Sequence, residues 1–397
     1  MRNKELILQI FTGGFKNNIT DYEKIIEKIN MLIDKININK IIIGWSMDLD
    51  MYVKLKEFLH EKNIEIFLWL PVFSEIGELK SAKTVVSWDN NQVKSYSLQE
   101  GENFEFYCPS SYENIESLKK VYEENFEEVG FDGVFLDKIR YPSFSNGIEG
   151  IFSCFCEKCI EEYEAMGIDV EEMKKEINNF ININNKEISN FNIESYEMGK
   201  YKFTNPLWEE FFNAKNEIIF NSLEDIYKYF KNKNLKVGID VFAPFLSYFV
   251  GQDMNKLQNT ADFIKPMMYR ITKAPAGLPF EFEKLVKAIN FGNSTYTNEE
   301  RMLEILGVHQ YNQEKFDLEF IKREIQYMSN NLHDCIYPGI EINRKDKIAE
   351  TYPDYIKENV TGIEGENVKG FVLSWDLLSA PEDNIEEVIN LFGRRGE

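Results

Sequence analysis

The stretch that decides the fold is residues 131–142, which read FDGVFLDKIRYP. Residues 133–136 are apolar on both sides of an extended chain, a pattern typical of a strand that is covered on both faces, as in a parallel sheet. The run ends at Asp137, and the charged Lys138 and Arg140 follow it closely. The stretch therefore predicts one strand of a parallel α/β fold with functional groups at its carboxyl end.

Similar apolar runs lie on both sides of this strand, with amphipathic helical stretches between them. Further strands are expected at 6–11, 40–45, 64–71, 236–239, 263–268, 337–340 and 370–373, and helices at 21–36, 51–62, 113–129, 206–229, 280–289, 318–330 and 385–392. Such alternation predicts an α/β fold, a (β/α)8 TIM barrel that occupies residues 1–397 as a single domain. A doubly wound open sheet is the alternative, but Thr12-Gly13-Gly14 does not match the dinucleotide fingerprint.

The chain is longer than a barrel needs, with 397 residues against about 250 in a typical case. We expect the excess in two insertions. The first, at 73–107, precedes strand four and is expected to be a β-hairpin with strands at 84–88 and 92–98. The second, at 143–200, follows strand four and is expected to be largely helical.

The composition excludes several classes of partner. The formal net charge of −22 opposes binding to nucleic acid and to anionic membranes. No apolar stretch is long enough for a membrane-spanning helix, and the first apolar run is too short for a signal peptide, so a cytoplasmic location is expected. Aromatic residues are frequent, with 31 Phe, 20 Tyr and 5 Trp. Most are expected in the core, although Tyr and Trp also stack on sugar rings.

Polar and aromatic residues follow the predicted strands, where a barrel carries its functional groups. They are Trp45 and Asp48 after the second strand, Asp137, Lys138, Arg140 and Tyr141 after the fourth, Asp240 after the fifth, Tyr269 and Arg270 after the sixth, Glu341 after the seventh, and Trp375 and Asp376 after the eighth. Carboxylates with aromatic rings suit glycosidic bond cleavage, which needs one protonated and one ionised carboxyl group. We expect the three acids Asp137, Asp240 and Glu341 to be catalytic, and the other residues to bind substrate.

Other hydrolytic centres find little support in the sequence. Only three histidines occur, His60, His309 and His333, and none belongs to an HxH or HExxH pair, so a metallohydrolase is disfavoured. A barrel enzyme acting on a phosphorylated small molecule would need a phosphate-binding loop after strands seven and eight. Residues 343–344 and 379–380 do not form a glycine-rich loop.

Three blocks of the sequence resemble barrels related to glycoside hydrolases: residues 131–142, the DVF, GQ and PMMY segments between 240 and 269, and GFVLSW at 370–375. The resemblance spans about residues 105–376 and implies hydrolysis of O-glycosyl bonds in an oligosaccharide or polysaccharide, with no cofactor required for catalysis. By similarity to α-amylases, Asp137 would be the nucleophile, Asp240 the acid/base and Glu341 a transition-state stabiliser, although Glu341 could equally be the acid/base.

The same resemblance implies that Arg140, Tyr269 and Trp375 orient the sugar. The 131–142 segment is also similar to chitinase-type barrels, but Ile139 stands where that pattern has its catalytic acid. Chitin hydrolysis through that motif is therefore not expected. A non-catalytic carbohydrate-binding barrel remains the alternative function.

Three of the five cysteines lie in the segment CFCEKC, as Cys154, Cys156 and Cys159. This spacing can supply three thiolates to a structural zinc ion. A fourth ligand could come from Cys108, His309, His333 or Cys335, and Cys108 is preferred because it lies shortly before the helix that leads into strand four. Reduced thiols without metal are the alternative.

Overall fold

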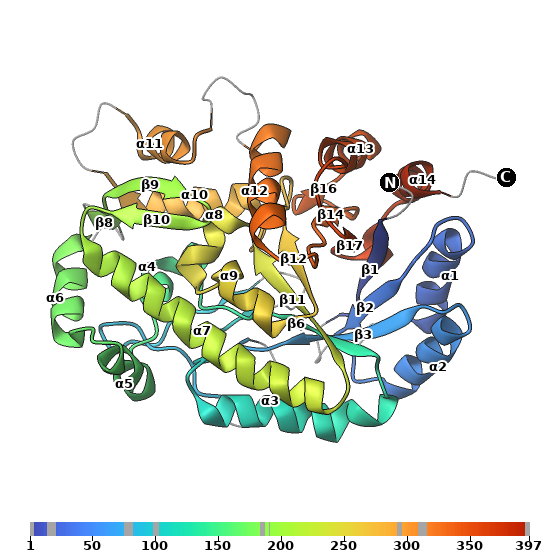
Figure 1. Cartoon of the computed structure of the whole chain (residues 1–397), viewed down its shortest axis with the longest axis horizontal. Coiled ribbons are helices and arrows are strands. Elements are labelled where there is room, and N and C mark those ends of the chain that lie inside the picture. The colour runs from blue at the N-terminus through green and yellow to red at the C-terminus, as the bar shows by residue number, and fades with distance from the viewer. Residues whose placement is uncertain are drawn as a thin grey trace.

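The computed structural model describes residues 4–13, 21–74, 82–97, 103–182, 187–189, 191–291, 296–308 and 316–393. Its centre is a barrel of eight parallel strands that follow one another in chain order (Figure 1). They are β1 (Glu5–Phe11), β2 (Lys40–Gly44), β3 (Glu65–Pro71), β6 (Gly133–Asp137), β11 (Lys236–Phe242), β12 (Phe263–Met267), β14 (Gly339–Glu341) and β17 (Gly370–Ser374). The predicted (β/α)8 fold is confirmed, with all eight predicted barrel strands found in the predicted order.

The barrel closes in two places. β17 pairs with β1 in parallel register. Between β12 and β14, the amide of Ile264 donates to the carbonyl of Cys335 at 2.8 Å, and the amide of Tyr337 donates to the carbonyl of Ile264 at 2.9 Å. Pro338 has no amide proton to donate, so the ladder is interrupted there. This explains why β14 begins at Gly339, two residues after the predicted start of strand seven.

Helices surround the barrel, and several of them begin at a side chain that caps their first turn. The main ones are α1 (Tyr22–Ile33), α2 (Leu49–His60), α3 (Tyr112–Asn125), α7 (Pro206–Asn232), α10 (Leu278–Ala288), α12 (Leu318–Asn331), α13 (Pro353–Gly362) and α14 (Glu382–Phe392). Asp21 and Ser111, for example, each accept a bond from a backbone amide of the first turn. The sequence did not predict α13. Within the described ranges, no helix combines the length and the apolar character that crossing a bilayer requires.

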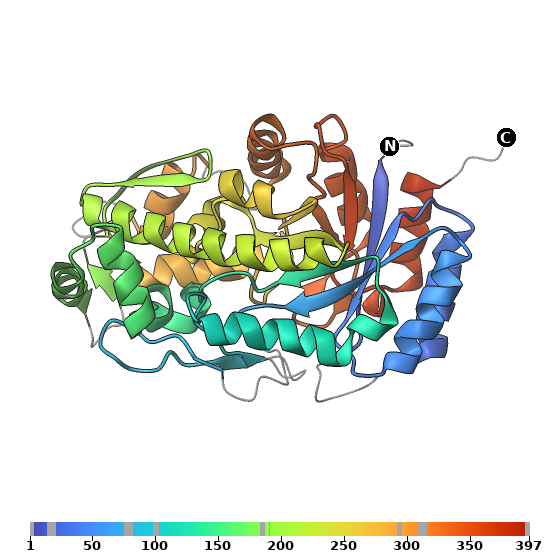
Figure 2. The same cartoon turned by 60° about the horizontal axis from the view of Figure 1, so that its bottom comes forward.

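Two insertions extend the barrel. In the first, isolated antiparallel bridges join Thr84 to Tyr107 and Val86 to Gln92, and the short strands β4 (Tyr96–Ser97) and β5 (Asn103–Phe104) pair antiparallel. Leu98, the last residue of the second expected strand, lies outside the described residues. Figures 1 and 2 both place the elements of the second insertion at the opposite end of the molecule from α1, α2 and α14.

The second insertion is helical in its first part only. It contains α4 (Gly147–Ile151), α5 (Glu157–Ala165) and α6 (Val170–Phe180), and then the antiparallel pair β9 (Ile193–Glu197) and β10 (Lys200–Phe203). The alternating burial of β10 fits a strand with one covered face.

A cluster of apolar side chains fills the inside of the barrel. Its members include Ile7, Ile42, Phe67, Phe135, Phe263, Tyr337 and Val372. Two glycines make room for its rings: a Cβ atom on Gly133 would lie 2.3 Å from Phe67 Cε1, and one on Gly238 would lie 2.1 Å from Phe263 Cζ. We call this cluster the aromatic plug.

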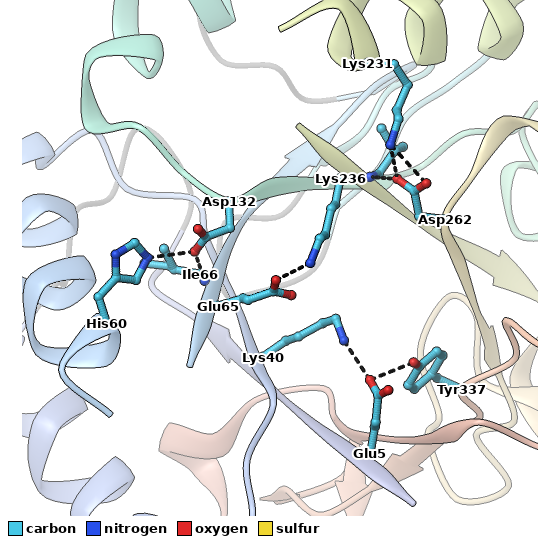
Figure 3. Close-up of polar contacts among 11 residues, drawn as sticks. Glu5, Lys40, His60, Glu65, Ile66, Asp132, Lys231, Lys236, Asp262 and Tyr337 are labelled. Atoms are coloured by element: carbon cyan, nitrogen blue, oxygen red, sulfur yellow. Dashed lines mark hydrogen bonds and ion pairs between the residues drawn. The ribbon is translucent and has the colours of Figure 1, made fainter. Parts of the chain in front are cut away.

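Paired charges surround the N-terminal mouth of the barrel (Figure 3). Lys40 Nζ lies 2.7 Å from Glu5 Oε2, which also accepts a bond of 2.9 Å from the Tyr337 hydroxyl. Asp132 accepts bonds from the Ile66 amide at 2.8 Å and pairs with His60 Nε2 at 2.9 Å. Lys236 with Glu65, and Lys231 with Asp262, make further pairs. Because these pairs join neighbouring elements and are partly exposed, we assign this mouth to stability.

Candidate active site

A pocket opens at the C-terminal mouth of the barrel. The residues that line it are Gln9, Phe11, Trp69, Phe104, Asp137, Lys138, Arg140, Asp240, Phe242, Lys265, Met267, Tyr269, Thr272, Ala274, Pro275, Ala276, Ile348 and Trp375. The pocket therefore brings together six of the twelve predicted catalytic and substrate-binding residues: Asp137, Lys138, Arg140, Asp240, Tyr269 and Trp375.

Two carboxylates enter this pocket from neighbouring strands. Leu136 of β6 pairs with Ile239 of β11 in parallel register, so the next residues, Asp137 and Asp240, lie at the same height of the barrel. Both side chains belong to the pocket wall. The arrangement gives two acids to one binding space, as glycosidic bond cleavage requires.

Asp137 is held by hydrogen bonds at both carboxylate oxygens. Trp69 Nε1 donates to Oδ2 at 2.9 Å, and the amide of Lys138 donates to Oδ1 at 2.5 Å. Lys138 has a positive φ of 52°, a backbone conformation that few non-glycine residues adopt. The turn after β6 thus directs its first amide back to the carboxylate.

Asp240 is more fully buried than Asp137 and has a different environment. Its Oδ2 atom is 2.8 Å from Lys265 Nζ, and both side chains are buried. Burial raises the pKa of Asp240 to about 7; the charge of Lys265 opposes this shift and the charge of Asp137 adds to it. Its other oxygen, Oδ1, has no hydrogen-bond partner in the part of the chain that the structure describes. Asp240 can therefore exchange a proton near neutral pH.

A buried polar network supports Asp240 from below. Lys265 Nζ also donates to Gln9 Oε1 at 2.9 Å, and the Ser374 hydroxyl donates to the same oxygen at 3.1 Å. Gln9, Lys265 and Trp69 were not among the residues predicted from the sequence. The signal for the first two was present, since each places a polar side chain inside a strand that is otherwise apolar.

Cations stacked on aromatic rings form one wall of the pocket. The Arg140 guanidinium lies between the rings of Phe106 and Phe242, 4.5 and 4.4 Å from their centroids. Burial lowers the pKa of Arg140 to about 10. Lys138 Nζ lies 4.2 Å from the centroid of the Phe104 ring. Such contacts hold the charged groups in fixed positions facing the pocket.

Glu341 does not line the pocket. Its Oε1 accepts bonds from the amide and the hydroxyl of Thr272, at 2.8 and 2.6 Å, and its Oε2 accepts one of 2.6 Å from the Tyr355 hydroxyl. Burial raises the pKa of Glu341. The carboxylate instead holds the loop after β12, and Thr272 and Ala276 of that loop form part of the pocket wall.

Other predicted binding residues also lie outside the pocket wall. Asp48 is the N-cap of α2, and Asp376 caps the short helix Leu377–Ser379. Arg270 Nε donates to the carbonyl of Phe316 at 2.6 Å, and the Tyr141 hydroxyl lies 3.9 Å from Cys159 Sγ. Trp45 packs behind the pocket, with its ring centroid 5.6 Å from that of Trp69.

The cysteines expected to bind metal come together. Cys108, Cys154, Cys156 and Cys159 place their sulfur atoms within 4.8 Å of one another. Two other candidates for the fourth ligand, His333 and Cys335, are not part of this group. The remaining candidate, His309, lies outside the described residues. The choice of Cys108 as the fourth member of the cluster thus agrees with the geometry, while metal binding itself stays a prediction.

Comparisons with known proteins identify the fold. No protein-family model and no curated protein matches the sequence. The structure is similar to the glycoside hydrolase domain of PgaB (BpsB) from Bordetella bronchiseptica, with a TM-score of 0.59, 9% identity and 99% of both chains covered. It is also similar to a β-galactosidase from the psychrophilic Marinomonas ef1, with a TM-score of 0.57 and 11% identity over 98% of this chain and 58% of that one. At such identities the likeness shows a shared barrel fold.

Proposed function

We propose that this protein is a glycoside hydrolase that cleaves a bond of an oligosaccharide or polysaccharide at the C-terminal mouth of its barrel. One observation carries the proposal: Asp137 and Asp240 line the same pocket but have different surroundings. Two carboxyl groups kept in different protonation states are what glycosidic cleavage needs. The fold that this chain shares with a glycoside hydrolase domain and a β-galactosidase adds support by analogy.

In this mechanism Asp240 is the general acid. With a pKa raised to about 7, it is largely protonated below neutral pH, and its unpartnered Oδ1 can present the proton to the leaving oxygen. Lys265 holds the other oxygen in place. As the bond to the sugar's anomeric carbon breaks, the proton moves from Asp240 to the leaving group.

Asp137 is the second carboxylate of the mechanism. In its ionised form it attacks the anomeric carbon as a nucleophile or activates water as a base. The bonds from Trp69 and from the Lys138 amide fix the direction of its oxygens. We assign Glu341, which the sequence suggested as an alternative acid/base, to positioning the loop after β12, because within the described ranges it is hydrogen-bonded by Ile271, Thr272 and Tyr355.

The wall of the pocket suits a sugar. Trp375 at the partly exposed rim and Tyr269 deeper inside offer ring faces for stacking, and Arg140 and Lys138 offer donors to hydroxyl groups. Ile139 is fully buried and cannot serve as an acid, so the proposal does not include chitinase-type hydrolysis through that position.

The test is a screen for released reducing ends with a panel of polysaccharides and aryl glycosides at acid, neutral and alkaline pH. Wild-type protein should cleave at least one member, and Asp137→Asn should not. Asp132→Asn, at the opposite mouth of the barrel, is the matched control and should keep the activity. If sugars bind but no glycan is cleaved, the protein is a carbohydrate-binding barrel and the proposed hydrolysis is wrong.

A further inference from the structure

The cysteine cluster lies outside the pocket, and the proposed hydrolysis does not use it. Cys108 Sγ lies 3.5 Å from Cys156 Sγ and 3.4 Å from Cys159 Sγ, too far for a disulfide, whose sulfur atoms are about 2.05 Å apart. In a tetrahedral zinc site with Zn–S bonds of about 2.3 Å, neighbouring sulfurs are about 3.8 Å apart. The observed spread, with all four sulfurs within 4.8 Å, brackets that value.

We propose that Cys108, Cys154, Cys156 and Cys159 bind a structural Zn²⁺ that fastens the chain just after the first insertion to the second insertion. Four cysteine ligands fill the coordination sphere, which leaves no position for water or substrate. Three of the cysteines are buried and only Cys156 is partly exposed. The site therefore contributes to folding and not to the chemistry of the pocket.

A buried lysine lies next to a residue that contacts the cluster. Lys215 is fully buried, and its Nζ donates to the carbonyl of Ile151 at 2.8 Å. The same Nζ lies 4.6 Å from the centroid of the Tyr141 ring, whose hydroxyl is 3.9 Å from Cys159 Sγ. Zinc with four thiolates carries two formal negative charges, which would favour the charged form of a lysine buried nearby.

Backbone groups around the cluster also favour thiolates. The amides of Val86 and Cys156 donate to Cys154 Sγ, at 3.4 and 3.5 Å. Cys156 is the N-cap of α5, and Cys159 lies in the first turn of that helix, where the helix dipole stabilises negative charge.

The site joins a segment that reaches the pocket to the second insertion. Cys108 comes shortly after Phe104, which lines the pocket, and Phe106, whose ring stacks on Arg140. The other three cysteines belong to the insertion after β6, and the amide of Phe155 donates to the carbonyl of Val86 at 2.8 Å. Zinc would thus hold the aromatic wall in place. This consequence for substrate binding rests on the proposed function, whereas the binding of the metal does not.

The experiment measures metal in the intact protein, purified under reducing conditions without added metal. Elemental analysis should find one zinc per chain. After replacement by Co²⁺, the spectrum should show the thiolate-to-cobalt charge transfer and the visible bands of tetrahedral cobalt. Cys108→Ser and Cys159→Ser should retain less than a tenth of the zinc and should unfold at lower temperature. Cys335→Ser, a buried cysteine outside the cluster, is the matched control and should retain all of it.

If the two variants do not fold, a titration of the wild-type protein keeps the proposal testable. A mercurial reagent should release zinc to a coloured chelator in proportion to the four cluster thiols it blocks. Less than a tenth of an equivalent of zinc together with no cobalt spectrum would overturn the proposal, as would a disulfide within the cluster or the absorption of an iron–sulfur centre. None of these readouts depends on hydrolytic activity, so a failure here is distinct from a failure of the proposed function.

Discussion

The two mouths of the barrel both carry charged side chains, but they hold them in different ways. At the N-terminal mouth, Glu5 and Asp132 are paired across neighbouring elements and partly exposed (Figure 3). At the C-terminal mouth, Asp240 and Lys265 are buried, and one oxygen of Asp240 has no partner in the described part of the chain. Burying an unpaired polar atom costs free energy. This difference is why we assign the N-terminal mouth to stability and propose the C-terminal mouth as the place of the chemistry.

The largest expected effect separates activity from stability. Asp137→Asn should lower kcat/KM by at least about 1000-fold, because a nucleophile or base is lost, with little change in the thermal midpoint. Asp132→Asn should do the reverse and lower the midpoint, since it weakens the pairing with His60 and Ile66. Kinetics and calorimetry on both variants check this contrast. Similar activity losses in the two would remove the distinction between the mouths.

A smaller loss is expected for Glu341→Gln. The amide of glutamine would place a donor against the hydroxyl of Tyr355 or the donors of Thr272, and the loop after β12 would shift. We expect kcat/KM to fall by about 10- to 100-fold with most of the change in KM. A loss as large as that of Asp137→Asn, in kcat alone, would show that Glu341 takes part in the chemistry after all.

The pH dependence of the rate sharpens the comparison further. Asp240 must be protonated to act as the acid, so kcat/KM should fall about tenfold per pH unit once the pH exceeds its pKa of about 7. Because the charge of Lys265 lowers this pKa, Lys265→Met should move the alkaline limb to higher pH. Glu5→Gln, at the other mouth, should leave it in place. A limb that does not move in Lys265→Met would contradict the assignment of Asp240.

The smallest effect belongs to the N-terminal mouth. A double-mutant cycle of Glu5→Gln and Lys40→Met should give a coupling free energy of unfolding of about 0.5 kcal/mol that decreases with added salt. Burial alone would raise the pKa of Glu5, but hydrogen bonds from Lys40 and Tyr337 outweigh it and leave the pKa lowered. The coupling should therefore be present at neutral pH and be lost as the pH falls through the lowered pKa of Glu5. A coupling free energy of zero at neutral pH and low salt would contradict a stabilising role of the Glu5–Lys40 pair.

The sequence predicted the barrel well because its strands are apolar on both faces, a pattern that stands out between amphipathic helices. Asp137 and Asp240 could be predicted because they follow or extend such strands. Asp240 was expected just past its strand, but β11 continues to Phe242. Asp240 therefore lies within the strand, and its side chain faces the pocket.

Side-chain direction could not be predicted at the other strand ends. Asp48 and Asp376 turn to cap the helices that follow them, and Glu341 turns to the loop after β12. The contacts of Glu341 depend on Thr272 and Tyr355, which come near only in the folded chain. The caps are local, with amides two or three residues further on, but the sequence does not decide between capping and facing the pocket. The role of Trp69 likewise depends on the pairing of β3 with β6, which a single segment of sequence does not specify.

The aromatic plug closes the inside of the barrel below the pocket, so the pocket opens only at the C-terminal mouth. The rings of Phe67, Phe135 and Tyr337 pack against Phe263 below the pocket, so water cannot arrive from the N-terminal side. A sugar seated at the rim would then stand between Asp240 and bulk solvent. Asp240 would then be reprotonated by water that enters through the same opening by which the product leaves. Reprotonation of the acid would therefore follow product release.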